Sequence, residues 1–406
     1  MQQTSMAGAA APQADSPGPL DGVRVLDFTM FLSGPYGTRL LADMGAEVIK
    51  IEPLAGDQLG RARRPLRNGY STVFGHMNAG KKSMLLDLKS QAGLKAALDL
   101  AKVSDVIVEN WRPGVADKLG MGYKAVSALN PGIIYCSISG FGQQGPWAQR
   151  AAYAAIVQAA SGFDIAQMGY QGAAAPAKTG IFVGDVMGGL SAFAAIQGAL
   201  YHRTKSGKGQ YIDVSLLDCM FNVLVHECQE AQHPLGTHGR LYRPLRTSDG
   251  YVVIAPSSPK NFKDMACCVG HPEWVDDARF SGARALETNW DQLMDLIEEW
   301  TGKQTSGQCE NALLSAAVPC ARYLNIAEAM NDPHTRMRGS FSEVRDAAGV
   351  YRVPNAPFKM PGLNTSVREN VPGFGDSTAH ILGKLLDYSQ AEIEACLPDS
   401  SKGKNQ

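Results

Sequence analysis

Apolar residues along the first half of the chain follow two alternating spacings. Val23–Phe28 and Glu47–Ile51 are short, apolar runs typical of buried strands. The segment between them places Leu40, Leu41 and Met44 on one face of a helix. Strand-like and helix-like patterns then recur in turn over Ser83–Leu88, Ser90–Val103, Val106–Glu109, Tyr123–Leu129 and Ile133–Ser139. This alternation predicts an open, mostly parallel α/β sheet with right-handed crossovers.

The stretch Lys178–Arg203 contains a chemically distinctive corner. We expect Ile181–Val183 to form a short strand, followed by Gly184 and then by Asp185 at the start of a long helix. Strand-to-helix corners often present reactive side chains in α/β proteins, because flanking glycines let backbone or substrate approach closely. Asp185 is therefore a candidate nucleophile, yet an aspartate here is also typical of a helix N-cap. The pattern alone leaves both roles open.

The character of the chain changes near His233–Pro234. A strand at Gln210–Ser215 and a long helix at Leu216–Ala231 precede this point, and mostly helical segments follow it. Phe341–Met360 is expected to return as β structure. The first residues are rich in Ala, Pro and Ser and lack aromatic residues, so they cannot bury enough surface to order themselves. We expect a disordered tail at 1–19, a large domain from 20–232 and 340–398, and a small domain with linkers at 233–339.

Composition narrows the class of protein. The 406 residues carry 38 Lys and Arg against 39 Asp and Glu, so no global charge favours nucleic acid or an anionic membrane. No basic segment precedes an apolar core at the N-terminus, and no run approaches the ~20 apolar residues that span a bilayer. The eight cysteines form no C-x-x-C pair, which is typical of reduced thiols in a cytoplasmic protein. The dispersed histidines give little support for a metal site.

Gly75–Lys82, GHMNAGKK, resembles most of a phosphate-binding P-loop. The position that should hold a magnesium-binding Ser or Thr is Lys82, however, and a strand rather than a helix follows. A nucleotide triphosphatase is therefore disfavoured. Loose binding of a phosphate-bearing ligand and an ordinary solvated turn both stay open.

Two further segments follow predicted strands, at the edge where parallel sheets bind ligands. In Glu109–Gly114, ENWRPG, Asn110 offers an amide, Trp111 a stacking face and Arg112 a planar fork for phosphate. The same segment is also typical of a strand-to-helix turn with proline at the first helical position. Ser139–Pro146, SGFGQQGP, is dense in glycine and is either an active-site loop or a flexible connector.

Taken together, these segments resemble one family. From Leu20 to about Leu397 the chain is similar to the class III CoA-transferases, the family of formyl-CoA transferase and carnitine-CoA transferase. The matching segments are LDGVRVLDFT, SGPYGTRLLADMGAEVIKIEP, NAGKKSMLLDL, VIVENWRPGV, KLGMGY, NPGIIYCSISGFGQQGP, GDVMGG, KSGKGQYIDVSLLD, DPHTRMRG and VPGFGDSTAHIL. Each is weak alone, and their order and spacing together are specific.

The resemblance implies a fold and an assembly. The family has a Rossmann-like large domain with a parallel sheet, an inserted smaller domain and a C-terminal segment that returns to the large one. Two chains are typically interlocked as a dimer, and some members are heteromers with a related subunit.

The resemblance also implies a reaction. The family's catalytic aspartate falls at Asp185, whose carboxylate attacks an acyl-CoA thioester and forms first a mixed anhydride and then an aspartyl-CoA thioester. A carboxylic acid acceptor then receives the CoA. An ordinary Asp pKa is enough for this role, because the ionised form attacks at neutral pH. CoA thioesters are therefore expected as substrates, with no permanently bound cofactor, no metal, and no nucleic acid or membrane partner.

Site residues carry over unevenly from the family. The positions expected to contact CoA are Phe31, Leu32, Ser33, Leu86, Lys89, Asn110, Trp111, Arg112 and Lys118. Those expected to line the substrate pocket are Ser139, Gly140, Phe141, Tyr153 and Ala154. The chain departs from the family at Leu32, where a polar residue is frequent, at Pro53, where some members have arginine, and at Ala151, where others have lysine.

The segment before the nucleophile departs further. Many members carry an acidic residue where this chain has Ala154, and a glycine-rich loop where it has Pro256–Lys260. A pocket lined by Ala151, Ala152, Ala154 and Ala155 would be roomier and less polar than one for formate or oxalate. We therefore expect a bulkier acceptor, such as a branched or aryl-substituted succinate, with succinyl-CoA as donor.

Other functions compete with this interpretation. The same fold hosts α-methylacyl-CoA racemases, in which a histidine and an aspartate move an α-proton. The racemase histidine falls at Tyr153 here, and a phenol with a pKa near ~10 is poorly matched to that task. An intramolecular CoA isomerase shares this weakness. A CoA-binding subunit of a heteromeric transferase is the alternative of another class, although Asp185 favours the catalytic chain.

Overall fold

The computed structural model describes residues 17–234 and 241–397. Most of the predicted tail at 1–19 therefore lies outside the described residues. The chain divides into two compact units, one formed by the chain up to Cys228 and from Arg336 onward, the other by Gln229–Thr335.

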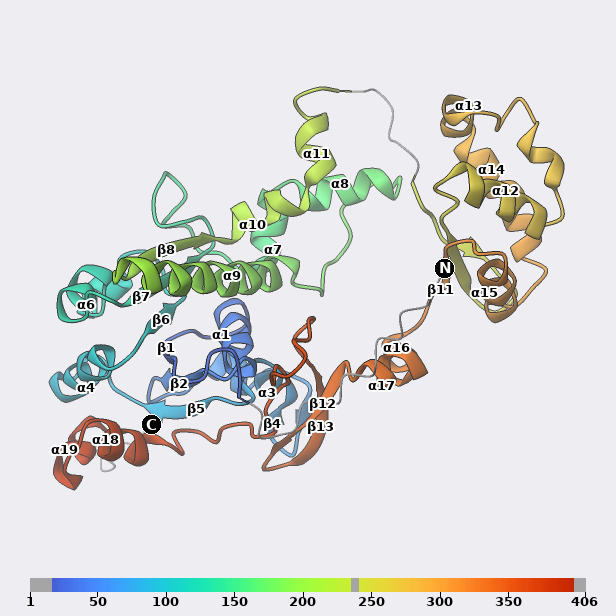
Figure 1. Cartoon of the computed structure of the whole chain (residues 1–406). Coiled ribbons are helices and arrows are strands. Elements are labelled where there is room, and N and C mark those ends of the chain that lie inside the picture. Colours follow the sequence, from blue (N-terminus) through green and yellow to red (C-terminus); the bar gives the residue numbers. More distant parts are fainter. Residues whose placement is uncertain (1–16, 235–240, 398–406) are drawn as a thin grey trace. The chain divides into compact units, whose positions relative to one another are not determined.

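A six-stranded sheet forms the centre of the first unit (Figure 1). Its strands are β1 (Arg24–Asp27), β2 (Glu47–Glu52), β5 (Lys82–Leu85), β6 (Val106–Glu109), β7 (Ile134–Ser139) and β8 (Gln210–Ser215). They pair in the order β5-β2-β1-β6-β7-β8, and every pairing is parallel. Numbered along the chain, this order is 3-2-1-4-5-6, the arrangement of the Rossmann fold. The predicted parallel α/β sheet is confirmed.

Helices cover both faces of this sheet because its strands are apolar on both sides. On one face, Val25, Val108 and Cys136 pack with α1 (Ser33–Asp43) and α9 (Val183–Ser206). On the other face, Leu26 and Ile107 pack with four helices, including two from the C-terminal segment. These four are α4 (Gln91–Lys102), α6 (Tyr123–Leu129), α18 (Thr378–Leu385) and α19 (Gln390–Cys396).

Close packing of α1 against α9 fixes the start of α9 over the sheet. A Cβ atom on Gly37 would lie 2.7 Å from the Gly189 carbonyl oxygen, and one on Gly189 would lie 2.6 Å from the Ser33 carbonyl oxygen. Only glycine permits this approach of two helix backbones. Gly189, four residues after Asp185, therefore lets α9 lie against the first turn of α1.

The structure differs from the predicted elements at two places. Ile181–Val183 is not a strand, because Val183 is already the first residue of α9 and residues 181 and 182 approach it as a loop. The long helix predicted at Leu216–Ala231 is interrupted at Leu224, which separates α10 (Leu216–Val223) from α11 (Val225–Glu230).

Smaller elements complete the first unit. They are α2 (Gln58–Arg61), β3 (Leu66–Arg67), β4 (Tyr70–Ser71), α3 (Thr72–Asn78), α5 (Val115–Lys118), α7 (Ala154–Ala160), α8 (Phe163–Tyr170), β12 (Phe341–Asp346) and β13 (Gly349–Pro354). The pair β12–β13 is an antiparallel hairpin, as the predicted β-rich return requires.

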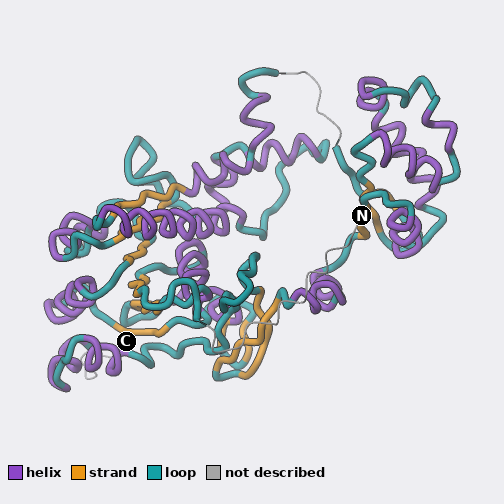
Figure 2. The backbone as a smooth tube through the Cα atoms, in the orientation of Figure 1, coloured by secondary structure: helices purple, strands orange, loops and turns teal. Residues whose placement is uncertain are grey.

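The second unit is mostly helical, with a small antiparallel sheet (Figure 2). Its elements are β9 (Leu245–Arg246), β10 (Tyr251–Ile254), α12 (Pro259–Cys268), η1 (Pro272–Val275), α13 (Ala283–Thr288), α14 (Trp290–Thr301), α15 (Ser306–Ser315), β11 (Cys320–Arg322) and α16 (Ile326–Asn331). Helix α17 (Pro333–Arg338) crosses the boundary back to the first unit. A core of its own, which includes Trp274, Trp290 and Leu293, stabilises this unit.

One helix in the described part of the chain, α9, is long and apolar enough to cross a bilayer by length and composition alone. Ala192, Ile196 and Ala199 on this helix are buried in the core of the first unit. The apolar face of α9 is therefore accounted for by packing on the sheet.

Candidate active site

The candidate site lies where the order of the main sheet reverses. The chain continues from β1 to β2 on one side, whereas β6 pairs with β1 on the other. Asn110, directly after β6, spans this switch point: its Oδ1 accepts from the Met30 N–H at 2.9 Å, and its Nδ2 donates to the Met30 carbonyl at 2.8 Å. Open α/β sheets bind ligands at this place, outside the carboxyl ends of the strands. Asn110 thus fixes the backbone of the loop after β1.

Phe31, the next residue in this loop, has a left-handed backbone with φ of 74°. Few non-glycine residues adopt this conformation, so the surroundings must hold it. The Asp57 carboxylate accepts from the Phe31 N–H at 3.3 Å and lies 3.4 Å from the Lys50 ammonium. Lys50 also donates to the carbonyl of Thr29 at 2.8 Å. The buried Lys50–Asp57 ion pair therefore holds the backbone of this loop at Thr29 and Phe31.

A second buried ion pair supports the same loop. Lys81 Nζ donates to Asp27 Oδ2 at 2.8 Å, and both side chains are fully buried. Lys81 also donates to Asn78 and to Thr38. The pKa of Asp27 is lowered to about 2, since the charges of Lys81 and Lys50 outweigh the effect of burial. Lys81 is therefore neither solvated nor available to a phosphate-bearing ligand, so both interpretations left open for this turn were wrong for Lys81.

Asp185 lies in the first turn of α9, three residues after the N-cap residue Phe182. It is thus inside the helix, and the N-cap role is not the one it has. Only 5% of Asp185 is exposed, and its Oδ2 has no hydrogen-bond partner among the described residues. Burial raises its pKa to about 6, and the charge of Arg63 opposes this rise. At pH 7 the carboxylate is still ionised, and the positive end of the α9 dipole favours its charge.

Two cavities meet at Asp185. One, of about 200 Å³, is lined by residues that follow β1, β6 and β7 and by the start of α9: Met30, Phe31, Leu32, Ser33, Asn110, Trp111, Ile138, Ser139, Gly140, Ala152, Tyr153, Asp185 and Leu216. The other, of about 480 Å³, is lined by Phe31, Ala62, Arg63, Tyr153, Ala154, Ala155, Phe182 and Asp185. Phe31, Tyr153 and Asp185 are common to both.

Most of the predicted site residues therefore come together. Ten of them line one or both cavities: Phe31, Leu32, Ser33, Asn110, Trp111, Ser139, Gly140, Tyr153, Ala154 and Asp185. Three of the four predicted pocket alanines do so too, since Ala151 is exposed outside both. Pro256–Lys260 lies in the second unit, at the start of α12.

Five predicted residues line neither cavity. Leu86 is buried in the hydrophobic core on the face of the sheet that α4 covers, so its side chain is not available to a ligand. Lys89, Arg112 and Lys118 are exposed near the carboxyl ends of β5 and β6. Phe141 packs edge-on against Trp147, with ring centroids 5.5 Å apart. The sequence correctly placed these five residues after strands, at the edge of the sheet. The direction in which each side chain points depends on tertiary packing, which a sequence pattern does not show.

Sequence reasoning missed Arg63 and Phe182, which both line the larger cavity. Arg63 lies in the basic run R-A-R-R at 61–64, which reads as a solvated loop. This loop follows α2, and only the tertiary fold places it at the same cavity as the start of α9. No local signal distinguished Arg63 from its neighbours.

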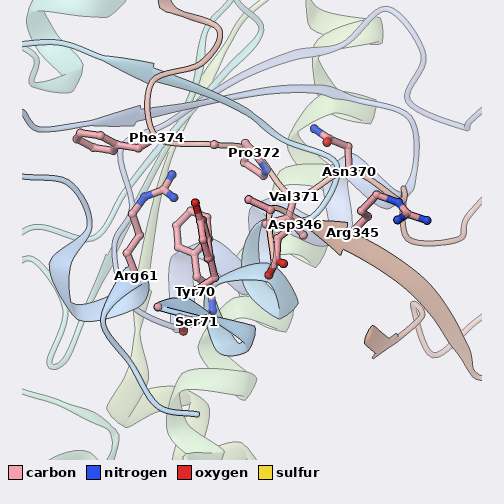
Figure 3. A pocket seen from close by; sticks show the side chains of 13 residues that line it. Arg61, Tyr70, Ser71, Arg345, Asp346, Asn370, Val371, Pro372 and Phe374 are labelled. Carbon is pink, nitrogen blue, oxygen red and sulfur yellow. Dashed lines mark hydrogen bonds between the residues drawn. The ribbon is translucent and has the colours of Figure 1, made fainter. Parts of the chain in front are cut away.

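A third cavity, of about 510 Å³, lies away from Asp185 between the β3–β4 hairpin and the C-terminal segment (Figure 3). Its charged groups are already paired: Arg61 with Glu52, Arg345 with Glu369, and Asp346 with Arg67. Tyr70 and Phe374 supply aromatic surface to it. The Asp346 carboxylate is ion-paired with Arg67, whereas Asp185 has no ion pair among the described residues, so the chemistry favours the cavities at Asp185.

The arrangement at Asp185 suits nucleophilic chemistry. Burial strips water from the carboxylate and raises its basicity, while the helix dipole keeps it ionised. The neighbouring walls are largely apolar, which protects a reactive acyl intermediate from hydrolysis. Hydrogen-bonding groups surround Asp185. They come from the loop after β1, whose backbone Asn110 fixes, and from the residues at the carboxyl ends of β6 and β7.

Comparison with known proteins gives one consistent result. The family model described as CoA-transferase family III matches residues 20–378. The succinyl-CoA:glutarate CoA-transferase of Mus musculus is 32% identical over 96% of this chain and 92% of its own length. The acetyl-CoA:oxalate CoA-transferase of Acetobacter aceti is 35% identical over 86% of this chain and 90% of its own. A crystal structure of a CAIB/BAIF family protein from Brucella suis superposes with a TM-score of 0.78 at 30% identity, over 91% of this chain and all of that one. The chain therefore belongs to CoA-transferase family III and is a CoA-transferase.

Proposed function

We propose that Asp185 is the nucleophile of this CoA-transferase and that it carries the acyl group and the CoA in turn. Its carboxylate attacks the donor thioester, which forms a mixed anhydride and releases the CoA thiolate. The thiolate attacks the aspartyl carbonyl, which forms the aspartyl-CoA thioester and releases the donor acid. The acceptor carboxylate then attacks that thioester, which forms a second anhydride and releases the CoA thiolate again. The thiolate attacks the acceptor's acyl carbon, which forms the acceptor's CoA thioester and frees the Asp185 carboxylate. Each step exchanges one acyl bond for another, so no redox partner is required.

One observation carries this proposal. Asp185 is 5% exposed, its Oδ2 has no partner within residues 17–234 and 241–397, and it lies where two cavities meet. A buried carboxylate without a hydrogen-bond partner is costly to the fold, so a functional role explains its presence better than a structural one. Its pKa of about 6 makes it more basic than an ordinary aspartate while leaving it ionised at neutral pH.

CoA is proposed to approach along the carboxyl edge of the sheet. Phe31, Ser33, Asn110 and Trp111 already line the smaller cavity, which leads to Asp185. The cations Lys89, Arg112 and Lys118 are exposed near the same edge, where they can interact with the phosphates of CoA. These three would contribute through charge alone. The CoA thioester is then a substrate, and no permanently bound cofactor is needed.

The acceptor is proposed to be a carboxylic acid larger than oxalate, with succinyl-CoA as the donor. Ala152, Ala154 and Ala155 take little room in the walls around Asp185. The relatives act, by name, on succinyl-CoA with glutarate and on acetyl-CoA with oxalate. A branched or aryl-substituted succinate fits the apolar wall. Comparable kcat/KM values for oxalate and for substituted succinates would contradict this assignment.

The assembly and the location are also proposals. We expect an interlocked homodimer, or a heteromer with a related subunit, in the cytoplasm, with the small domain inserted in the large one. The presence of Asp185 supports an active chain in either case. Light scattering of the protein expressed alone, combined with the transfer assay, distinguishes a self-sufficient homodimer from an inactive half of a heteromer.

Trapping tests the nucleophile. The protein is incubated with succinyl-CoA and hydroxylamine, digested, and analysed by mass spectrometry. A hydroxamate on the peptide that contains Asp185 is the expected product, because hydroxylamine intercepts both proposed intermediates. Full transfer activity of Asp185→Ala together with no hydroxamate would contradict the proposal. Asp218→Asn is the control, since Asp218 is exposed in the first turn of α10 and lines neither cavity.

A further inference from the structure

Arg63 is held beside Asp185 in an unusual way. Its guanidinium carbon lies 4.8 Å from the centre of the Phe31 ring and 5.0 Å from the centre of the Phe182 ring. Phe31 is itself fixed by Asp57 and Asn110 through the loop after β1. Phe182 is the N-cap residue of α9, three residues before Asp185. Both rings that contact Arg63 are therefore positioned by the same elements that position the nucleophile.

The guanidinium is positioned but not neutralised. Stacking on aromatic rings uses the faces of this planar group and leaves the N–H groups at its edge available. Across the described ranges 17–234 and 241–397, the Arg63 guanidinium has no ion pair closer than 4.0 Å and no hydrogen bond. Arg61, two residues earlier, donates instead to both Glu52 oxygens, at 2.6 and 2.8 Å. Arg63 thus differs from its neighbour in facing a cavity with its donors free.

The larger cavity combines two opposite charges with apolar side chains. Asp185 and Arg63 are its two charged residues, and Ala154, Ala155 and Phe182 are among the others that line it. A fork of N–H donors is the group that binds a carboxylate in two parallel hydrogen bonds. An acid that reacts at Asp185 would lay its methylene groups along the alanines.

We infer that Arg63 binds the second carboxylate of a dicarboxylic acid whose first carboxylate reacts at Asp185, and so selects dicarboxylates over monocarboxylates. This inference rests on the proposed role of Asp185 as nucleophile. The acceptor attacks when Asp185 is a neutral thioester, so Arg63 is then the remaining protein charge in the cavity and attracts the dianion. The dicarboxylic acids in the names of the two relatives, glutarate and oxalate, are consistent with this selection.

Two other roles for Arg63 predict different kinetics. If Arg63 only adjusts the charge state of Asp185, its loss affects every acceptor equally. If it binds a phosphate of CoA, its loss raises the KM for the acyl-CoA donor, whatever the acceptor. Only recognition of a distal carboxylate changes the ratio between acids that differ in that one group.

The experiment compares two acids of equal chain length, glutarate and pentanoate, as acceptors with succinyl-CoA as donor. The kcat/KM for each is measured at about pH 8, well above the pKa of about 6 that Asp185 has beside Arg63, and any change in that pKa affects both acids equally. Wild-type protein should prefer glutarate, and in Arg63→Met the ratio of the two values should fall about 100-fold, the usual effect of one lost charge-assisted pair. Arg63→Lys keeps the charge without the fork and should fall between. Arg64→Met, which removes an exposed charge next to Arg63, should leave the ratio unchanged.

Each other outcome counts against the inference. A wild-type protein that uses pentanoate as well as glutarate, an equal loss for both acids in Arg63→Met, or a rise confined to the donor KM would overturn it. Should Arg63→Met fail to fold, Arg63→Lys and Arg63→Gln give the same comparison. Failure of the proposed function looks different: no hydroxamate then forms on Asp185, whereas a wrong assignment of Arg63 leaves trapping and transfer intact.

Discussion

Asp185→Asn should make the protein more stable while abolishing CoA transfer. The carboxylate is buried without a hydrogen-bond partner in the described part of the chain, so the folded state has to hold a poorly solvated charge. Replacing it by a neutral amide of nearly the same shape removes that charge and disturbs the packing of α9 little. Stability and activity then change in opposite directions, which is expected for a group retained for function.

The magnitude follows from the pKa of Asp185, which burial raises from 3.8 to about 6. The ionised form is penalised in the folded state, so the penalty appears as the pH rises above 3.8 and is complete above about 6. Linkage gives about 3 kcal/mol at pH 7.5 and about 1 kcal/mol at pH 4.5. For a unit of this size, about 3 kcal/mol corresponds to an increase in Tm of about 5 °C.

Thermal unfolding followed by circular dichroism at the two pH values provides the assay. The Tm difference between Asp185→Asn and wild type should be largest at pH 7.5 and about three times smaller at pH 4.5. Asp218→Asn serves as the control, because Asp218 is exposed in the first turn of α10 and should lose only its small interaction with the helix dipole. No gain at pH 7.5, or an equal gain at both pH values, would refute the reasoning, since neither fits a buried charge.

Three further predictions concern the site and its supports. The kcat/KM for transfer should rise with pH through about 6, because only ionised Asp185 attacks; initial rates between about pH 5 and 8 check this, and a flat profile contradicts it. Asp27→Asn and Lys81→Met should each lower the free energy of unfolding by about 3–5 kcal/mol, since each leaves a buried charge unpaired. In urea unfolding, the double variant should lose less stability than the two single variants added together. Gly189→Ala should destabilise by about 1–3 kcal/mol, because its Cβ would lie 2.6 Å from a carbonyl oxygen of the adjoining helix, while Gly198→Ala, with open space around it, should be neutral or stabilising.

The sheet could be predicted well because its signal is local. Val106–Glu109, Tyr123–Leu129 and Gln210–Ser215 have the predicted bounds, since strand and helix periodicities and their boundary residues lie within each segment. The short run before Asp185 was misread, because Ile181–Val183 has β-branched residues but its last residue already belongs to α9. Tertiary packing of α9 on α1 overrode that local preference.

The sequence indicated where the candidate site lies, but only some of the side chains that face it. Loops after parallel strands converge on one edge, so Phe31, Asn110 and Ser139 could be placed together from the order of strands. Whether a side chain on that edge points into the cavity depends on its neighbours, and Leu86 turned into the core instead. Arg63 lay outside any recognised motif, since its role comes from contacts with residues far away in the chain.

The central claim is that Asp185 forms acyl bonds during transfer, and the path of oxygen atoms tests it most directly. In the proposed sequence, the acceptor carboxylate donates the bridging oxygen of the second anhydride, and that oxygen stays on Asp185 when CoA leaves with the acceptor. Turnover with an acceptor acid labelled in its carboxylate with the heavy oxygen isotope should therefore place the label on the peptide containing Asp185, as mass spectrometry of the digested protein would detect. An unlabelled peptide after many turnovers would contradict the account.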